Sequence, residues 1–188
     1  MRVMLFGPPG AGKTVAAQAL AGAVGHVLYL DDHVERLKRS DVTLNLPLSD
    51  QALESAIYGL LAEAAQQATC LVEVAHHDFD RVSRLCAGLW TPGSAQFVVL
   101  HAPLCTLLSR NRSRPPANQI PEVYLLRCLH ETLRVIECIA EDAVGFGSEH
   151  CWITDQCVFD TSRDFLAEVV GGVNRSLSDN LRYGAELE

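Results

Sequence analysis

The chain has 188 residues, a formal net charge of −8, 48% hydrophobic residues and 20% charged residues. A chain of this length can bury a substantial core, and the balance of apolar and charged residues is typical of a soluble globular protein, so we predict a single domain over residues 1–188. The negative charge disfavours bulk nucleic-acid binding, because a surface that binds duplex normally carries the opposite sign.

The cysteines and the lengths of the apolar segments indicate the cellular compartment of the protein. The seven cysteines are scattered and form no Cys-x-x-Cys pair. This usage predicts reduced thiols and no zinc site. No apolar segment approaches the roughly 20 residues of a membrane span. An apolar strand is predicted at the N-terminus, where a signal peptide would otherwise stand. We therefore predict a cytoplasmic protein that does not enter a membrane.

Apolar runs alternate with amphipathic stretches along the chain, which is typical of an α/β protein with a parallel sheet. Strands are predicted at residues 2–6, 26–30, 70–75, 96–101 and 157–160, the last with a short piece near 151–153. Helices are predicted at residues 13–23, 50–68, 78–89, 103–112, 121–142 and 162–177. The stretches without clear periodicity are predicted loops, where substrate sites and lids occur, and they cover residues 37–48, 113–120 and 144–156.

The most informative motif is Gly-Pro-Pro-Gly-Ala-Gly-Lys-Thr at residues 7–14. It matches G-x-x-x-x-G-K-[ST] and lies between a predicted buried strand and a predicted helix, which is the context of a phosphate-binding loop. Glycines let successive N–H groups curve around a phosphate, and the helix start adds its positive dipole end. The motif predicts a nucleotide site formed by Gly7, Pro8, Pro9, Gly10, Ala11, Gly12, Lys13, Thr14 and Val15.

Within this site, Lys13 is expected to reach the β- and γ-phosphates and the Thr14 hydroxyl to ligate Mg²⁺. Asp31 and Asp32 close the second predicted strand, at the same edge of the sheet as the loop. A carboxylate there could take the proton of an attacking hydroxyl or help hold Mg²⁺, and we favour Asp31 over Asp32 for a catalytic role, with helix capping as the alternative for both. Glu73 lies inside an apolar strand, where a carboxylate is costly without a partner. A magnesium-shell role for it and a simple outward orientation both stay open.

Arginines after the fourth strand predict a lid. Arg110 and Arg114 share a helix face, and arginines that close over a γ-phosphate stabilise its developing charge. Pro115 and Pro116 follow at once, so we predict a hinged lid at about residues 108–122, with a solvated basic helix end as the alternative.

Other polar groups near strand ends are weaker candidates. His76 and His77 follow the third strand and are candidates for substrate contact or for the base. Arg81 and Arg84 are candidates for holding an anionic substrate, although ordinary surface arginines explain them as well. Thr161 caps the predicted last helix or borders the nucleotide base.

Taken together, these residues resemble the small phosphate-loop kinases, the group that contains polynucleotide kinase, chloramphenicol phosphotransferase, gluconate kinase and shikimate kinase. The resemblance covers roughly residues 2–175. It rests on residues 7–14, Leu30-Asp31-Asp32, the strand with Glu73, Arg110-Asn111-Arg112-Ser113-Arg114 and Val158-Phe159-Asp160-Thr161-Ser162.

The resemblance implies a phosphate-loop NTPase fold, with a five-stranded parallel sheet in the order 2-3-1-4-5, helices on both faces and a small helical lid. It also implies ATP with Mg²⁺ as the phosphate donor, Asp31 as the general base and lid arginines that contact phosphates, and we place Asp32 or Glu73 at the Mg²⁺ through water. The chain departs from the family at Glu73, where aspartate is common, and at His76, where Asn or Thr is common. The catalytic residues predicted on this basis are Lys13, Asp31, Arg110 and Arg114.

We therefore predict an ATP-dependent kinase that phosphorylates a hydroxyl of a small metabolite or natural product. A polynucleotide or nucleoside 5′-hydroxyl kinase and a catalytically inert nucleotide-binding module stay open, as does the oligomeric state, a homodimer included. A GTPase is disfavoured because Lys13 and Lys38 are the only lysines and neither lies in an Asn-Lys-x-Asp motif. An AAA-type motor is disfavoured because no strand ends in Asp-Glu and the chain is short.

Overall fold

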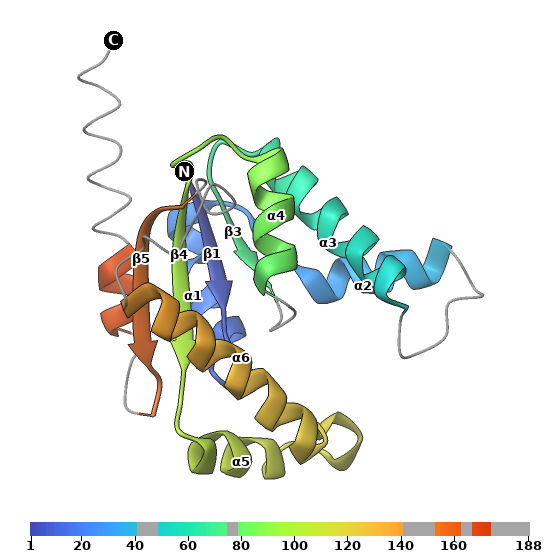
Figure 1. Cartoon of the computed structure of the whole chain (residues 1–188), viewed down its shortest axis with the longest axis vertical. Helices are drawn as coiled ribbons and strands as arrows, with labels where there is room; N and C mark the ends of the chain where they lie inside the picture. The colour runs from blue at the N-terminus through green and yellow to red at the C-terminus, as the bar shows by residue number, and fades with distance from the viewer. Residues whose placement is uncertain (41–48, 75–78, 141–152, 163–166, 174–188) are drawn as a thin grey trace.

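The computed structural model describes residues 1–40, 49–74, 79–140, 153–162 and 167–173 (Figure 1). Residues 167–173 form a helical segment after the last strand. In chain order, the other elements are β1 (Arg2–Phe6), α1 (Lys13–Val24), β2 (Val27–Tyr29), α2 (Leu30–Ser40), α3 (Asp50–Ala65), β3 (Cys70–Glu73), α4 (Phe79–Leu89), β4 (Ala95–His101), α5 (Leu104–Arg112), the 3₁₀ helix η1 (Pro116–Asn118), α6 (Glu122–Ala140) and β5 (Ile153–Asp160).

The five strands form one parallel sheet in the order β2-β3-β1-β4-β5, which confirms the predicted fold class. The register places Glu73 of β3 beside Leu5 of β1 and beside Tyr29 of β2. These three strands therefore end at the same edge of the sheet. The loop after β1, the start of α2 and the carboxylate of Glu73 are neighbours for that reason.

Helices cover both faces of the sheet, as predicted (Figure 1). Alternate residues of β1 point to opposite faces, because side chains in a strand alternate. Met4 and Phe6 pack in a core with α3 and α4, in which Phe79 and Phe97 have ring centroids 4.9 Å apart. Val3 and Leu5 pack in a second core with α1 and the helical residues 167–173. No helix in the described part of the chain is long and apolar enough to cross a membrane.

Helix α2 was not predicted from the sequence. Residues 37–40 were assigned to a loop, and Leu30 and the two aspartates after it to the end of a strand, but β2 ends at Tyr29 and α2 begins at Leu30. Leu30, Val34 and Leu37 recur at helical spacing and pack into the core that contains α3. The many charges between these positions conceal the pattern. Residues 41–48 lie outside the described residues.

The predicted bounds of β5 were also wrong. The strand begins at Ile153, inside the short piece predicted near 151–153, and continues through residues 154–156, for which the sequence predicts a loop; it pairs with β4 across an irregularity between Ala95 and Gln96. The stretch Thr154-Asp155-Gln156 is polar because β5 is the edge strand of the sheet, where a continuous apolar run is not required. Residues 151 and 152 lie outside the described residues.

The predicted lid segment connects α5 to α6 through η1. Asn111, which is buried near the end of α5, donates from Nδ2 to Ile120 O at 2.8 Å and accepts from Ile120 N at 2.9 Å through Oδ1. Gln119 donates from Nε2 to Arg112 O at 3.3 Å and to Arg114 O at 3.0 Å. The connection between the two helices is therefore held by its own side chains, with Arg114 carried on it.

Candidate phosphoryl-transfer site

The phosphate loop joins β1 to α1, and two of its glycines are required by the backbone. Gly7 has φ of 148°, and a Cβ there would lie 2.1 Å from the carbonyl oxygen of Leu100 on β4. Gly12 has φ of 86° and is the N-cap of α1, where a left-handed conformation turns the chain into the helix. The first turn of α1 holds no acidic residue. Its free N–H groups and positive dipole end are therefore available to an anion.

Replacing Gly7 with alanine is expected to lower the melting temperature and weaken Mg·ATP binding, because the new Cβ overlaps the Leu100 carbonyl and the loop must shift. We expect a loss of stability of about 1–3 kcal/mol. Gly22→Ala is the matched control, since a Cβ at Gly22 of α1 meets nothing within 4 Å. Wild-type nucleotide affinity in Gly7→Ala would contradict the requirement for this loop geometry.

Lys13 is the first residue of α1, and its ammonium is buried inside the loop. Nζ donates to Gly7 O at 2.8 Å and to Pro8 O at 3.2 Å. Burial lowers the pKa of Lys13, whereas the carboxylates of Glu73 and Asp31 oppose that shift. The acceptors of the ammonium are neutral carbonyls, and an anionic phosphate oxygen forms a stronger, charge-assisted bond. The geometry therefore suits capture of a phosphate by Lys13.

The Glu73 carboxylate faces the phosphate loop. Thr14 Oγ1 donates to Glu73 Oε1 at 3.1 Å, and Glu73 Oε2 is buried with no hydrogen-bond partner among the described residues. Burial raises the pKa of Glu73, while Lys13 and the bond from Thr14 act in the opposite direction. A buried carboxylate oxygen without a donor is costly. The structure thus favours a role at the site over a simple outward orientation.

Hydroxyl and carboxylate oxygens are the ligands that Mg²⁺ prefers, so Thr14 and Glu73 fit this ion. Among the described residues, no group of three or more His, Cys, Asp or Glu side chains could hold a metal ion alone. That agrees with the usual mode of Mg²⁺, which binds with one or two carboxylates and the phosphates of a substrate.

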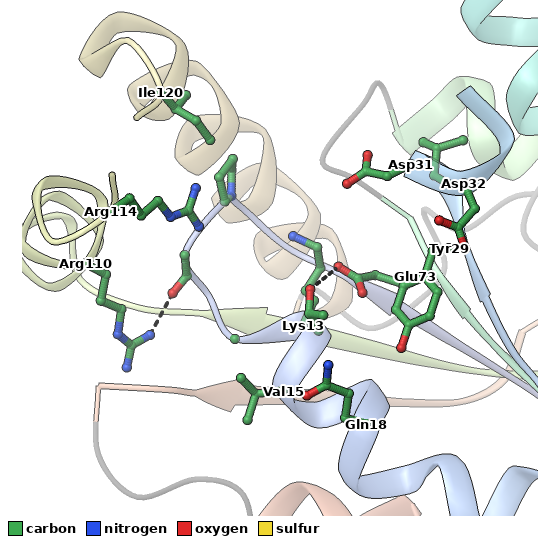
Figure 2. Close-up of a pocket in the computed structure, with 15 residues that line it drawn as sticks. Lys13, Val15, Gln18, Tyr29, Asp31, Asp32, Glu73, Arg110, Arg114 and Ile120 are labelled. Carbon is green, nitrogen blue, oxygen red and sulfur yellow. Dashed lines mark hydrogen bonds between the residues drawn. The ribbon is translucent and has the colours of Figure 1, made fainter. Parts of the chain in front are cut away.

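Asp31 and Asp32 occupy the first turn of α2 and are both exposed. Neither side chain forms a hydrogen bond or an ion pair with another described residue, so both carboxylates are available to a ligand. Figure 2 shows both on the side of the phosphate loop opposite to Arg110 and Arg114. They lie at the start of a helix and not at the end of a strand, as was predicted. Because β2 ends at Tyr29, they still lie at the predicted edge of the sheet.

The structure separates the predicted lid arginines. Arg110 donates from one guanidinium nitrogen to Gly10 O at 2.8 Å and to Thr161 Oγ1 at 3.1 Å, and from another to Thr161 O. Its guanidinium therefore ties α5 to the phosphate loop, as Figure 2 shows, and also to the turn after β5. Arg112 pairs with Glu122 at 2.9 Å. Arg114 lines the cavity that the loop faces.

That cavity has a volume of about 940 Å³, at the upper end of the range for small-molecule sites. Most of the predicted site residues line this cavity, and four further lining residues were not predicted from the sequence. The predicted lining residues are Pro9, Gly10, Gly12, Lys13, Thr14, Val15, Asp31, Asp32, Glu73, Arg110 and Arg114, and the missed ones are Gln18, Tyr29, Leu30 and Ile120.

Other predicted residues lie elsewhere. Gly7, Pro8 and Ala11 are in the loop but do not line the cavity. Arg81 lies 3.8 Å from Asp50, and neither it nor Arg84 lines the cavity. His76 and His77 lie outside the described residues.

A phosphate loop after β1, in a parallel sheet of order 2-3-1-4-5, defines a phosphate-loop NTPase. The chain belongs to the AAA_33 family, described as an AAA domain, whose model matches residues 3–135. No curated protein matches the sequence significantly.

Solved structures with a similar fold include small kinases. A gluconokinase from Sinorhizobium meliloti 1021 has a TM-score of 0.65 and 22% identity, over 97% of this chain and 96% of that one. A shikimate kinase from Acinetobacter baumannii in complex with shikimate has a TM-score of 0.56 and 13% identity, over 95% and 93%. A deoxyadenosine kinase from M. mycoides with bound dATP has a TM-score of 0.53 and 13% identity, over 95% and 100%. The predicted resemblance to small phosphate-loop kinases is confirmed as a likeness of fold.

Proposed function

We propose that this protein is a kinase that transfers the γ-phosphate of ATP to a hydroxyl of a small molecule. One observation carries the proposal: Lys13 and Thr14 of the phosphate loop and the two exposed aspartates of α2 line the same cavity. The cavity has room for a nucleotide tail and a small acceptor. Kinases of small molecules among the proteins of similar fold support the same reaction class.

In the proposed mechanism, the loop N–H groups and Lys13 bind the β- and γ-phosphates, and Arg114 contacts the transferring group from the lid. Arg110 is a positioning residue, because its guanidinium holds the loop at Gly10 O. Asp31 accepts the proton of the acceptor hydroxyl while the oxygen of that hydroxyl bonds to the γ-phosphorus. The bond from the γ-phosphorus to the β,γ-bridging oxygen breaks, which releases ADP.

Thr14 and Glu73 would hold Mg²⁺ with the nucleotide, Glu73 in part through water. When bound, the ion neutralises charge on the phosphate oxygens. Exclusion of water from the cavity limits hydrolysis of ATP.

The direct test is transfer of radiolabel from γ-labelled ATP in the presence of Mg²⁺, with sugars, polyols, amino alcohols, nucleosides and short oligonucleotides as acceptors. A thermal-shift measurement with Mg·ATP and with Mg·GTP runs beside it. We expect stabilisation by Mg·ATP and label on a small alcohol. Label on an oligonucleotide would indicate a polynucleotide kinase instead, and stabilisation with no transfer to any acceptor would indicate an inert nucleotide-binding module.

Replacing Glu73 with glutamine is expected to raise the Mg²⁺ concentration for half-maximal turnover by about 10- to 100-fold, because the carboxylate that faces Thr14 loses its charge. The measurement is a Mg²⁺ titration at fixed ATP. Glu54→Gln on the exposed surface of α3 is the control and should leave the titration unchanged. An unaltered Mg²⁺ requirement in Glu73→Gln would exclude Glu73 from the metal site.

A further inference from the structure

The cavity is divided by charge. Its lining cations are Lys13, Arg110 and Arg114. Figure 2 shows both arginines on one side of the phosphate loop, with Asp31 and Asp32 on the other. The cationic side is where phosphate oxygens would bind. The other side is the one from which an acceptor would reach the γ-phosphate, and its described lining adds Tyr29, Leu30 and Glu73. That side therefore presents carboxylates, an aromatic ring and an aliphatic side chain.

Three cations on the neighbouring helices have acidic partners. Arg36 on α2 bonds to Glu63 at 3.0 Å, and Lys38 bonds to Glu35 at 2.8 Å. Arg134 on α6 lies 3.1 Å from Asp80 and 2.9 Å from Glu131. An anionic ligand would have to displace a carboxylate to use one of these groups. An aspartate on the acceptor side, in contrast, has no described partner to give up.

We infer, on the basis of the proposed kinase function, that the acceptor is an alcohol without an anionic group and that an amine on it strengthens binding. An anion beside Asp31 and Asp32 meets like charge in a partly desolvated cavity, whereas an ammonium finds an acceptor there. The α2 dipole opposes this by only about half a positive charge, against two carboxylates. With Asp31 engaged by the reacting hydroxyl, Asp32 is the partner for the ammonium.

Two matched series of compounds test this inference. Gluconate, glucitol and glucamine share one hydroxylated chain and differ only at carbon 1, which is a carboxylate, an alcohol or an amine. Glucuronate, glucose and 6-amino-6-deoxyglucose give the cyclic counterpart, with the change at carbon 6. Affinity of the wild-type protein is measured by calorimetry with a non-hydrolysable ATP analogue and Mg²⁺ bound, at low and high salt. We expect glucamine to bind at least about tenfold more tightly than gluconate, with a smaller ratio at high salt.

Variants assign the effect to a residue. Asp32→Asn should reduce the ratio of the two affinities, and Asp32→Lys should reverse the preference. Glu35→Gln, which removes an acidic group on α2 paired with Lys38 and outside the cavity lining, should leave the ratio unchanged. Retention of the ratio in Asp32→Lys would overturn the assignment to this aspartate.

The inference and the proposed function fail in different ways. The inference is overturned if the anion of either series binds more tightly than the amine. It is also overturned if affinity does not depend on charge, or if no member of the two series binds. Transfer of phosphate to an anionic alcohol would overturn it too, while leaving the kinase proposal standing. Failure of the protein to bind Mg·ATP would overturn the proposed function itself.

Discussion

Lys13→Ala is expected to lower phosphoryl transfer by at least about 10²-fold, the scale of losing one preorganised electrostatic stabiliser. The ammonium is buried and held by Gly7 O and Pro8 O, so its charge is fixed where the loop N–H groups converge. A buried cation stabilises developing charge more strongly than a solvated one, because the cavity screens it less. Turnover with the best acceptor and the Kd for Mg·ATP are the measurements.

Lys38→Ala is the matched control for this experiment. Lys38 is the only other lysine in the chain, and it pairs with Glu35 outside the cavity lining, so its loss should leave transfer unchanged. A melting curve of each variant separates loss of chemistry from loss of fold. Near-normal transfer by a folded Lys13→Ala protein would refute the role of this side chain and, with it, the central assumption of the proposed mechanism.

The phosphate loop was predictable because its information is local. The motif consists of eight consecutive residues between an apolar strand and a helix. This local pattern predicts both the path of the backbone and the position of Lys13. The sheet order followed from the family that these residues resemble, and the structure confirms it. The extent of a single domain, by contrast, stays a prediction.

The remaining parts of the site depend on contacts between residues far apart in the sequence. The bonds from Arg110 to Thr161 join residues separated by 51 positions, so nothing near Arg110 reveals that its guanidinium is held by the turn after β5. The role of Glu73 was open for a similar reason. Its position beside Thr14 comes from the pairing of β3 with β1, which a strand pattern alone does not specify.

Asp31→Asn is expected to lower transfer by about 10²- to 10⁴-fold, the usual contribution of a general base, while Mg·ATP binding survives. Asparagine keeps the size and polarity of the side chain but cannot accept the hydroxyl proton. Asp32→Asn is the comparison variant, because both aspartates lie in the first turn of α2 and both losses weaken the same helix-dipole interaction. The measurements are single-turnover transfer and the Kd for Mg·ATP.

The pair of variants distinguishes three arrangements of the site. If only Asp31→Asn loses transfer, Asp31 is the base. Transfer that remains in Asp32→Asn then agrees with a binding role for Asp32. Loss confined to Asp32→Asn exchanges the two roles, since the neighbouring carboxylate is exposed on the same helical turn. Transfer that persists in both variants moves the base to His76 or His77.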